Sequence, residues 1–401
     1  MRKLMLSGAL GVIVVGVGVG ELMHWREAHA GASGTLPGTV NVVEAATFDS
    51  LQAAIDALPA TGGVVRLPPG QFEITEPLVI ETDDVLLEGQ GTGTHIVNKN
   101  TEGQPAIFIR PKGYKTDGKT KLWRVQMSNL RVTGNDKSGD GISALRVNEV
   151  FIDRVTVSYH GADGIRLDRC YEDPRVANSL ITYNKQTGLT LLGCHDIIVS
   201  ANHFEENLDA VRCLDGFNLC MSGNNVDDHL RHGIVIENTY GSIVSSNMIE
   251  ECKGIAMILD RDCYGITIAA NTIAHHQQGG IDLRDAHGIV ITGNTFPLVR
   301  QNALVIGPAS GRITVTGNHF SGSYIGDGKT KLPVDQQPAS GITLSGTSDI
   351  VISGNSFAGL QTKALTLIPA PSSRVAFIGN VLTDVESDHK DLIDSVVADN
   401  V

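Results

Sequence analysis

The fold is decided by two short apolar segments, Gly280-Ile281-Asp282-Leu283-Arg284 and Ile289-Val290-Ile291-Thr292-Gly293-Asn294-Thr295-Phe296. Versions of this pair recur along most of the chain, and an asparagine marks each copy: Asn202, Asn224, Asn247, Asn271, Asn294, Asn318, Asn355 and Asn380. Consecutive asparagines are 22, 23, 24, 23, 24, 37 and 25 residues apart. A repeat of this length predicts a solenoid, in which each repeat forms one coil stacked on its neighbours.

The coils are predicted to consist of β-strands. The 401 residues include only 5% aromatics, and β-branched triplets such as Ile197-Ile198-Val199 are common. One strand of each coil follows a Gly-Ile-x-Leu pattern, which places the apolar residues inside and the residue between them on the surface. Parallel crossovers are right-handed, so we expect an all-β, right-handed, single-stranded parallel β-helix of about 11 rungs. The asparagines are expected to form an internal ladder at a tight bend.

A capping helix is predicted before the first coil. The segment from Thr47 to Leu58 places Leu51, Ala54, Ile55 and Leu58 on one face, and Pro59 ends it. Such a helix would cover the apolar end of the solenoid and its unpaired strand edges.

Two motifs come after this helix: Gly62-Gly63-Val64-Val65-Arg66-Leu67-Pro68-Pro69-Gly70 and Leu87-Glu88-Gly89-Gln90-Gly91. With them the chain resembles the pectate-lyase-like superfamily of right-handed β-helix proteins over about residues 47–98, and the asparagine rungs extend the resemblance to about residue 380. The resemblance implies the fold and leaves the activity open, because the superfamily contains lyases, hydrolases, epimerases and proteins without activity.

The N-terminus has the pattern of an export signal. Arg2 and Lys3 precede an apolar run from Leu4 to Gly20, and Ala28-His29-Ala30 fits a cleavage site. The run is also long enough to remain as a membrane anchor, so both alternatives stay open. The expected organisation is a signal peptide or anchor at 1–30, a linker at 31–46, the β-helix with its cap at 47–384, and a C-terminal cap at 385–401. The expected location is secreted, periplasmic or in the cell envelope.

The net charge excludes one class of partner, and the cysteine positions predict whether disulfides form. The net charge of −13 argues against nucleic acid as a partner, because proteins that bind nucleic acids carry a basic stripe. Of the six cysteines, Cys170 and Cys194 each lie five residues after an inward apolar residue and should stack on each other. We therefore expect small buried residues in a ladder, although export would permit disulfides.

Charged side chains are concentrated on the central rungs. In the outward column of the Gly-Ile-x-Leu strands, Arg166, Arg212 and Asp282 are charged, whereas outer rungs carry Ser, Thr or Val and the rung of Gly254-Ile255-Ala256-Met257 carries alanine. The remaining candidates lie two residues further along the strands or on the turns around them: Asp168, Glu237, Arg284, Asp260, Arg231, His232, His275 and His276. A solenoid gains no stability from charging only its middle, so this convergence predicts a site.

These residues allow two kinds of chemistry. Carboxylates on adjacent rungs stand about 5 Å apart, as in retaining glycosidases, and those two rungs apart stand about 9–10 Å apart, as in inverting ones. The first spacing is expected for Asp260 with Asp282, and the second for Glu237 with Asp282. A lyase or epimerase instead needs a base for the proton beside a uronate carboxylate, and His229, His232, His275 and His276 are candidates.

Substrate binding is assigned to the remaining candidates, namely Arg166, Asp168, Arg212, Arg231, Arg284 and His275. Asp227-Asp228, and Asp260 with Asp262, offer carboxylate oxygens, so Ca²⁺ is the one cofactor that the sequence suggests. The sequence thus predicts an exported enzyme acting on a polysaccharide, acidic rather than neutral, by lyase, epimerase or hydrolase chemistry. The alternative is a non-catalytic glycan-binding or cell-surface β-helix protein.

Overall fold

The computed structural model describes residues 41–322, 339–368 and 370–401, and residues 41–401 form one compact unit. The predicted signal peptide or anchor at 1–30 and most of the predicted linker lie outside the described residues. Within the described residues, no helix combines the length and the apolar character needed to cross a membrane.

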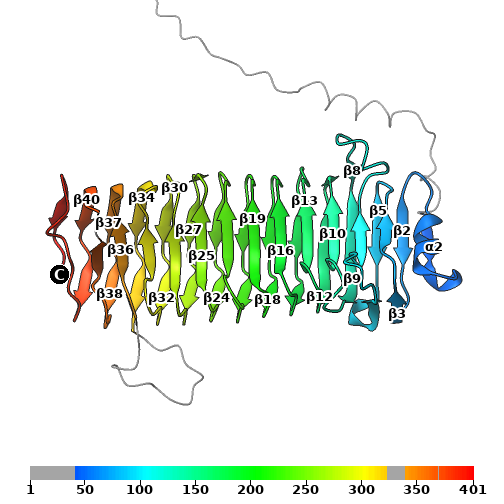
Figure 1. The fold of residues 1–401 in the computed structure, drawn as a ribbon, viewed down its shortest axis with the longest axis horizontal. Helices are drawn as coiled ribbons and strands as arrows, with labels where there is room; N and C mark the ends of the chain where they lie inside the picture. Colours follow the sequence, from blue (N-terminus) through cyan, green and yellow to red (C-terminus); the bar gives the residue numbers. More distant parts are fainter. Residues whose placement is uncertain (1–40, 323–338, 369) are drawn as a thin grey trace, which may run out of the picture. The chain divides into compact units, whose positions relative to one another are not determined.

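The described unit is a parallel β-helix whose strands stack side by side from α2 to the C-terminus (Figure 1). One sheet holds 12 parallel strands, and we call it the 12-stranded sheet. Its members are β4 (Leu78–Ile80), β7 (Ile107–Ile109), β10 (Ile142–Leu145), β13 (Ile165–Asp168), β16 (Thr187–Leu192), β19 (Asp209–Leu214), β22 (Ile234–Glu237), β25 (Ile255–Asp260), β29 (Gly279–Leu283), β33 (Leu304–Ile306), β36 (Ile342–Ser345) and β39 (Leu365–Ile368). The expected number of about 11 rungs is therefore slightly low.

The other walls of each coil belong to one 28-stranded sheet. A central coil shows the arrangement: β19 is followed by β20 (Cys220–Ser222) and β21 (Asn225–Asp227), and β22 then begins the next coil. Each of these strands pairs in parallel with its counterpart one coil away. The alternation of buried and exposed residues in these strands follows the pleat, so the apolar residues fill the interior.

The predicted asparagine ladder is confirmed. Asn271 is buried, and its Nδ2 donates to the Val244 carbonyl oxygen and to Asn294 Oδ1, both at 3.0 Å. The same bonds recur from coil to coil and continue past Asn380 to Asn400. The side-chain amides thus satisfy backbone groups that the tight bend leaves unpaired.

The interior beside this bend holds stacked aromatic rings. The ring centroids of Phe296 and Phe320 lie 4.6 Å apart, and those of Phe320 and Phe357 lie 4.9 Å apart. These residues lie two positions after their asparagines, so one repeat sets both the ladder and the stack.

The capping helix is shorter than the predicted Thr47–Leu58. A 3-10 helix covers Ala45–Thr47, and α2 spans only Leu51–Asp56, because the Ser50 side chain accepts a hydrogen bond from the Ala53 N–H and starts the helix there. The apolar face of α2 packs into the core as expected.

Both ends of the described unit carry strands outside the predicted β-helix limits. β1 (Val42–Glu44) lies in the expected linker and pairs with β2 (Gly63–Arg66). β42 (Val396–Ala398) lies in the expected C-terminal cap and pairs with β40 (Ser373–Ile378).

Candidate functional site

The charged residues lie on the outer surface of the central strands of the 12-stranded sheet. Strand register aligns them in two columns. The first column runs Arg166, Thr190, Arg212, Val235, Ile258, Asp282 and Val305, and the second runs Asp168, Leu192, Leu214, Glu237 and Asp260. Arg284 directly follows β29, and its N–H donates to the Leu259 carbonyl oxygen, which places it beside Asp260.

The register of β25 differs from the sequence-based prediction. Ala256 was expected in the outward column, but Ile258 pairs with Val235 and Ala256 is fully buried. The larger apolar residues Met257 and Leu259 take the inward positions, because they fill the core better than Ile255 and Met257 would. As a result Glu237 and Asp260 become direct neighbours on adjacent strands, whereas Asp282 pairs with Ile258 and is diagonal to Asp260.

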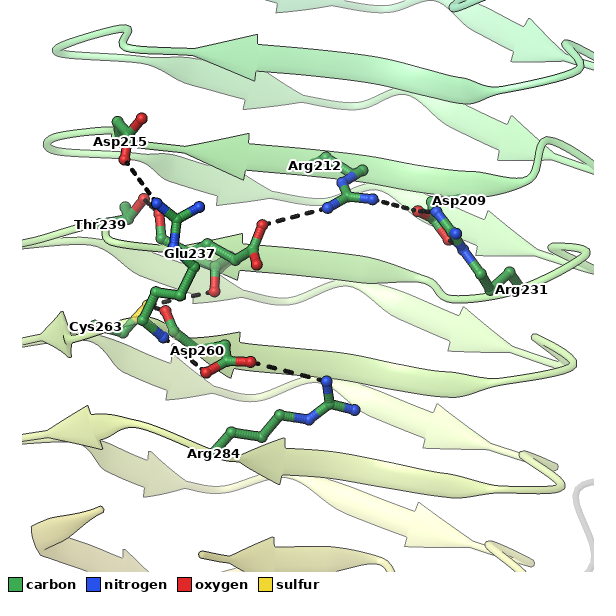
Figure 2. Close-up of polar contacts among 11 residues, drawn as sticks. Asp209, Arg212, Asp215, Arg231, Glu237, Thr239, Asp260, Cys263 and Arg284 are labelled. Carbon is green, nitrogen blue, oxygen red and sulfur yellow. Dashed lines mark hydrogen bonds and ion pairs between the residues drawn. The ribbon is translucent and has the colours of Figure 1, made fainter. Parts of the chain in front are cut away.

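One ion-pair chain starts at Asp209, the first residue of β19 (Figure 2). The Arg231 guanidinium binds both carboxylate oxygens of Asp209, and Arg212 lies 3.6 Å from Asp209 and 3.2 Å from Glu237 Oε2. Burial favours the neutral form of Asp209, but hydrogen bonds from Arg231 and from the His232 N–H outweigh it, so the pKa of Asp209 is lowered. Asp209 is therefore a buried, charged anchor for two arginines that face the surface.

A second ion-pair group is centred on Arg284. Its Nε lies 2.8 Å from Asp282 Oδ2, and its Nη1 lies 3.8 Å from Asp260 Oδ2. The Arg284 side chain is 44% exposed, so solvent or a ligand can reach it. Figure 2 shows that Arg212 with Glu237, and Arg284 with Asp260, lie on the same surface of neighbouring strands.

His232 lies at the edge of this surface but does not have the predicted role of base. Its Nδ1 accepts a hydrogen bond from the Ile255 N–H at 3.1 Å, which fixes the ring proton of the neutral form on Nε2. Burial lowers the pKa of His232, and Arg231, Arg284 and Arg212 oppose the raising effect of the Asp209 carboxylate. A neutral His232 can donate a hydrogen bond from Nε2, but its lone pair is already used.

The prediction that His276 is catalytic is wrong. His276 is fully buried, and its Nε2 lies 3.1 Å from the Ile249 carbonyl oxygen, so it cannot contact a substrate. It belongs to a second internal column, at the bend before the 12-stranded sheet, with His160, Asn184, Asn207, His229 and Cys252. Burial lowers the pKa of His276 to about 4.

Three further candidates lie apart from the central group. His275 pairs with Glu250 at 2.8 Å and with Glu251 at 3.6 Å, on the bend after β28 (Thr272–Ala274). Hydrogen bonding to Glu250 raises the pKa of His275. Arg166 pairs with Asp163, and Asp168 pairs with Arg169, so both sit on β13 with the uncharged β16 between them and Arg212.

No group of three possible metal ligands in the described residues includes both Asp260 and Asp262, which were expected to hold Ca²⁺. In the described part of the chain Asp262 groups with Asp285 and His287, and a second group of donors consists of Glu250, Glu251 and His275. Asp227 and Asp228 stay near each other, and burial together with the negative charge of Asp228 raises the pKa of Asp227. A cation beside Asp227 would relieve this repulsion.

Comparison with known proteins identifies the family. The model of the right-handed β-helix region matches residues 140–269 and 254–395, which together exceed half of the chain. The chain belongs to the right-handed β-helix family. A comparison with curated proteins finds no match.

Three solved structures are similar to this chain at low sequence identity. The A-module of a mannuronan C-5 epimerase from Azotobacter vinelandii is 18% identical, with 86% of this chain and 94% of that chain covered and a TM-score of 0.51. DFA-IIIase from Arthrobacter chlorophenolicus, in complex with GF2, is 14% identical, with 90% and 99% covered and a TM-score of 0.56. ORF18 of Geobacillus virus E2 is 16% identical, with 81% of this chain and only 59% of that chain covered and a TM-score of 0.49.

The β-helix thus brings together Arg212, Arg231, Glu237, Asp260, Asp282 and Arg284, with His232 at the edge. We call these residues the central face. Asp209, which pairs with Arg212 and Arg231, was not among the predicted site residues. Its neighbour on β16 is Thr187, and His232, which precedes β22, donates its backbone N–H to Asp209 Oδ1.

Proposed function

We propose that this β-helix protein is an enzyme that acts on a uronate-containing polysaccharide at the central face. The observation that carries the proposal is the contiguous group of arginine and carboxylate side chains on β19, β22, β25 and β29 and their flanking residues. β13 also carries Arg166 and Asp168, but the uncharged β16 separates them from this group. Further along the same outward column lie Val305 and Thr343, which offer no such groups. The similarity to a mannuronan C-5 epimerase supports an acidic polysaccharide as the substrate class.

The central face offers what proton abstraction beside a carboxylate needs. Arg212, Arg231 and Arg284 provide positive charge that can neutralise the substrate carboxylate and so stabilise the carbanion-like transition state. His232 can donate a hydrogen bond from Nε2 to the same group. The base is then a carboxylate of the central face, and Asp282 is the first candidate because it lies in the outward column.

Lyase and epimerase chemistry share this first step and differ in the second. Loss of the leaving group gives an unsaturated product, whereas return of a proton to the opposite side of the carbon gives the epimer. Hydrolysis would instead use Glu237 and Asp260, which are neighbours on strands about 4.8 Å apart, close to the carboxylate spacing of retaining glycosidases.

The second candidate function is binding without catalysis. It is favoured by the ion pairs themselves, because Arg284 with Asp282 and Arg212 with Glu237 are mutually satisfied before any ligand arrives. A glycan could replace these ion pairs with its own polar contacts without any covalent bond being broken. Export through residues 1–30 and a requirement for Ca²⁺ are further parts of the proposal.

The test uses the full chain with alginate, pectate and a neutral glucan in D₂O. Deuterium at the carbon beside the carboxylate reports proton abstraction, ultraviolet absorbance reports an unsaturated product, and new reducing ends without absorbance report hydrolysis. Repeating the reactions with EDTA tests Ca²⁺. We expect deuterium incorporation with an acidic glycan, and its absence from every acidic glycan together with no new ends would overturn the proposal.

Variants locate the reaction. Asp282→Asn and Arg284→Gln should each lower the rate at least about tenfold, which corresponds to about 1.4 kcal/mol of transition-state stabilisation. Asp349→Asn is the matched control, since Asp349 forms a similar exposed ion pair with Arg374 on an outer coil. Equal rates for all three variants would place the site elsewhere.

A further inference from the structure

A column of aromatic and imidazole rings runs along the bend after the 12-stranded sheet. Its members are Tyr171, His195, Phe217, Tyr240, Tyr264 and His287, at separations of 24, 22, 23, 24 and 23 residues. Parallel bridges join His195 to Phe217, Phe217 to Tyr240, and Tyr240 to Tyr264, and Tyr264 pairs with His287. The rings of Tyr171 and His195 lie 4.6 Å apart. We call this column the aromatic track.

The fold does not require these rings. The residue before each one is small and buried, as Cys194, Thr239 and Cys263 show, and it fills the inside of the bend. The outward position itself makes no steric demand, because the next coils carry Gly311, Ser348 and Ser373 there. The aromatic track is thus confined to six coils in the middle of the β-helix, including the four that carry the central face.

Two of the rings are exposed and the other four are partly exposed, although aromatic residues are scarce. They make up only 5% of the chain, and five phenylalanines are fully buried in the core. By contrast Phe217 is 43% exposed and Tyr264 is 48% exposed. Cations lie near two of the rings, with Lys121 Nζ 4.8 Å from the ring centroid of Tyr171, the first ring of the track, and the Arg312 guanidinium 5.9 Å from that of Tyr264, the fifth. The middle rings, Phe217 and Tyr240, have no cation over them among the described residues.

Planar polar groups border the track on both sides. Along one side Asn218 Nδ2 donates a hydrogen bond to Asp196 Oδ1 at 2.8 Å. Along the other side Asn238 Nδ2 donates to Asp215 Oδ1, also at 2.8 Å. The Tyr240 hydroxyl donates to Asn238 Oδ1 at 2.6 Å. A narrow apolar stripe between amides and carboxylates is the chemistry that sugar rings match, because their C–H faces stack on aromatic rings while their hydroxyls bond to planar polar groups.

We propose that the aromatic track is a second glycan-binding surface, separate from the central face, on which a polysaccharide chain lies along the β-helix axis. The coils repeat every 4.8 Å or so, close to the rise of about 5 Å per sugar in an extended glycan, so successive sugars meet successive rings. Asn238 and Arg261 have left-handed backbone at the bend between Glu237 or Asp260 and the track. The track therefore flanks the central face and does not form part of it.

A protein partner fits the track less well than a glycan. The stripe is one residue wide and bordered by charged and amide groups, whereas the core of a protein interface is a broad, desolvated patch. The proposal does not depend on catalysis, because a chain could be held on the track whether or not the central face converts it.

The test is affinity electrophoresis of the full chain through native gels containing alginate, pectate or a neutral glucan. We expect retardation in at least one gel, and the double variant Phe217→Ala Tyr240→Ala should lose at least about tenfold in affinity. The control is Tyr159→Ala, which removes an exposed tyrosine stacked on Tyr183 at 5.2 Å, on the bend before the 12-stranded sheet. Denaturant unfolding of both variants should match that of the unmodified chain.

Two outcomes would overturn the proposal that the aromatic track binds a glycan. One is the absence of retardation in every gel. The other is equal retardation of the double variant and the unmodified chain, especially if Arg284→Gln abolishes it, which would place binding on the central face. Failure of the catalytic proposal is visible separately, as absence of product from a chain that is still retarded.

Discussion

Replacing Asn271 by alanine tests how much the asparagine ladder stabilises the β-helix. Asn271 Oδ1 accepts hydrogen bonds from the backbone N–H and from Nδ2 of Asn247, both at 3.0 Å. Its Nδ2 donates to Val244 and Asn294, also at 3.0 Å. Asn271→Ala therefore removes four buried hydrogen bonds and leaves the Asn247 N–H without an acceptor, while the backbone bond from Asn271 N–H to Asn294 survives.

The expected loss is about 4 kcal/mol of unfolding free energy. A buried hydrogen bond contributes about 0.5–1.5 kcal/mol net, and an orphaned buried donor costs about 1–3 kcal/mol, so four bonds and one orphan bracket this value. The matched control is Asn400→Ala at the end of the same ladder. Asn400 makes three such bonds but is only partly buried, so water can replace them and about 1 kcal/mol should be lost.

Urea unfolding followed by circular dichroism measures the difference between the two variants. Solenoids can unfold in parts, so hydrogen exchange at the Asn247 backbone amide should be measured as well. We expect this exchange to be faster in Asn271→Ala and unchanged in Asn400→Ala. If the two variants lose equal free energy, or if the Asn271→Ala loss stays below about 1 kcal/mol, the ladder does not have the assigned role.

Two further predictions concern buried side chains. Burial lowers the pKa of His160, His229 and His276 to about 4 from 6.5, so the unfolded chain binds more protons between these values and stability falls as pH falls through them. The variant His276→Asn places in this column the residue type of Asn184 and Asn207. Between pH 6.5 and 4 its unfolding free energy, measured by urea titration, should fall by up to about 3 kcal/mol less than that of the unmodified chain. An equal fall in both proteins would contradict the prediction. All six cysteines are free and only Cys220 is exposed, so a thiol reagent should label one cysteine in the native chain and six after denaturation, whereas rapid labelling of more than one would disagree.

The scaffold was predictable because its determinants repeat. Asn271, Asn294 and their counterparts bond to each other across coils, so one periodic signal in the sequence corresponds to one continuous feature in space. The register of β25 was not predictable from the same pattern. Gly254-Ile255-Ala256-Met257 imitates the repeat, but Met257 and Leu259 fill the core, and only packing distinguishes the two registers.

The site was predictable in part. Arg212, Glu237, Asp282 and Arg284 share one surface as expected, because the alternation of strand residues fixes which side each one faces. The prediction for His276 was wrong because a histidine on a bend can point inward as well as outward. Its burial is explained by its column, which repeats through Asn184, Asn207, His229 and Cys252, a periodicity that the sequence contains.

The asparagine ladder also limits where the chain can change its length. The coils from Asn202 to Asn400 each return an asparagine to the same bend, yet the distance between successive asparagines varies from 20 to 37 residues. The 37-residue interval gains its length between β35 (His319–Ser321) and β36, and the interval before β8 (Leu122–Trp123) gains its length after β7. Along the chain the first addition precedes β36 and the second follows β7, and both of these strands belong to the 12-stranded sheet. Evolution can therefore add or remove segments beside that sheet, and alter what it binds, while the opposite edge of every coil stays fixed.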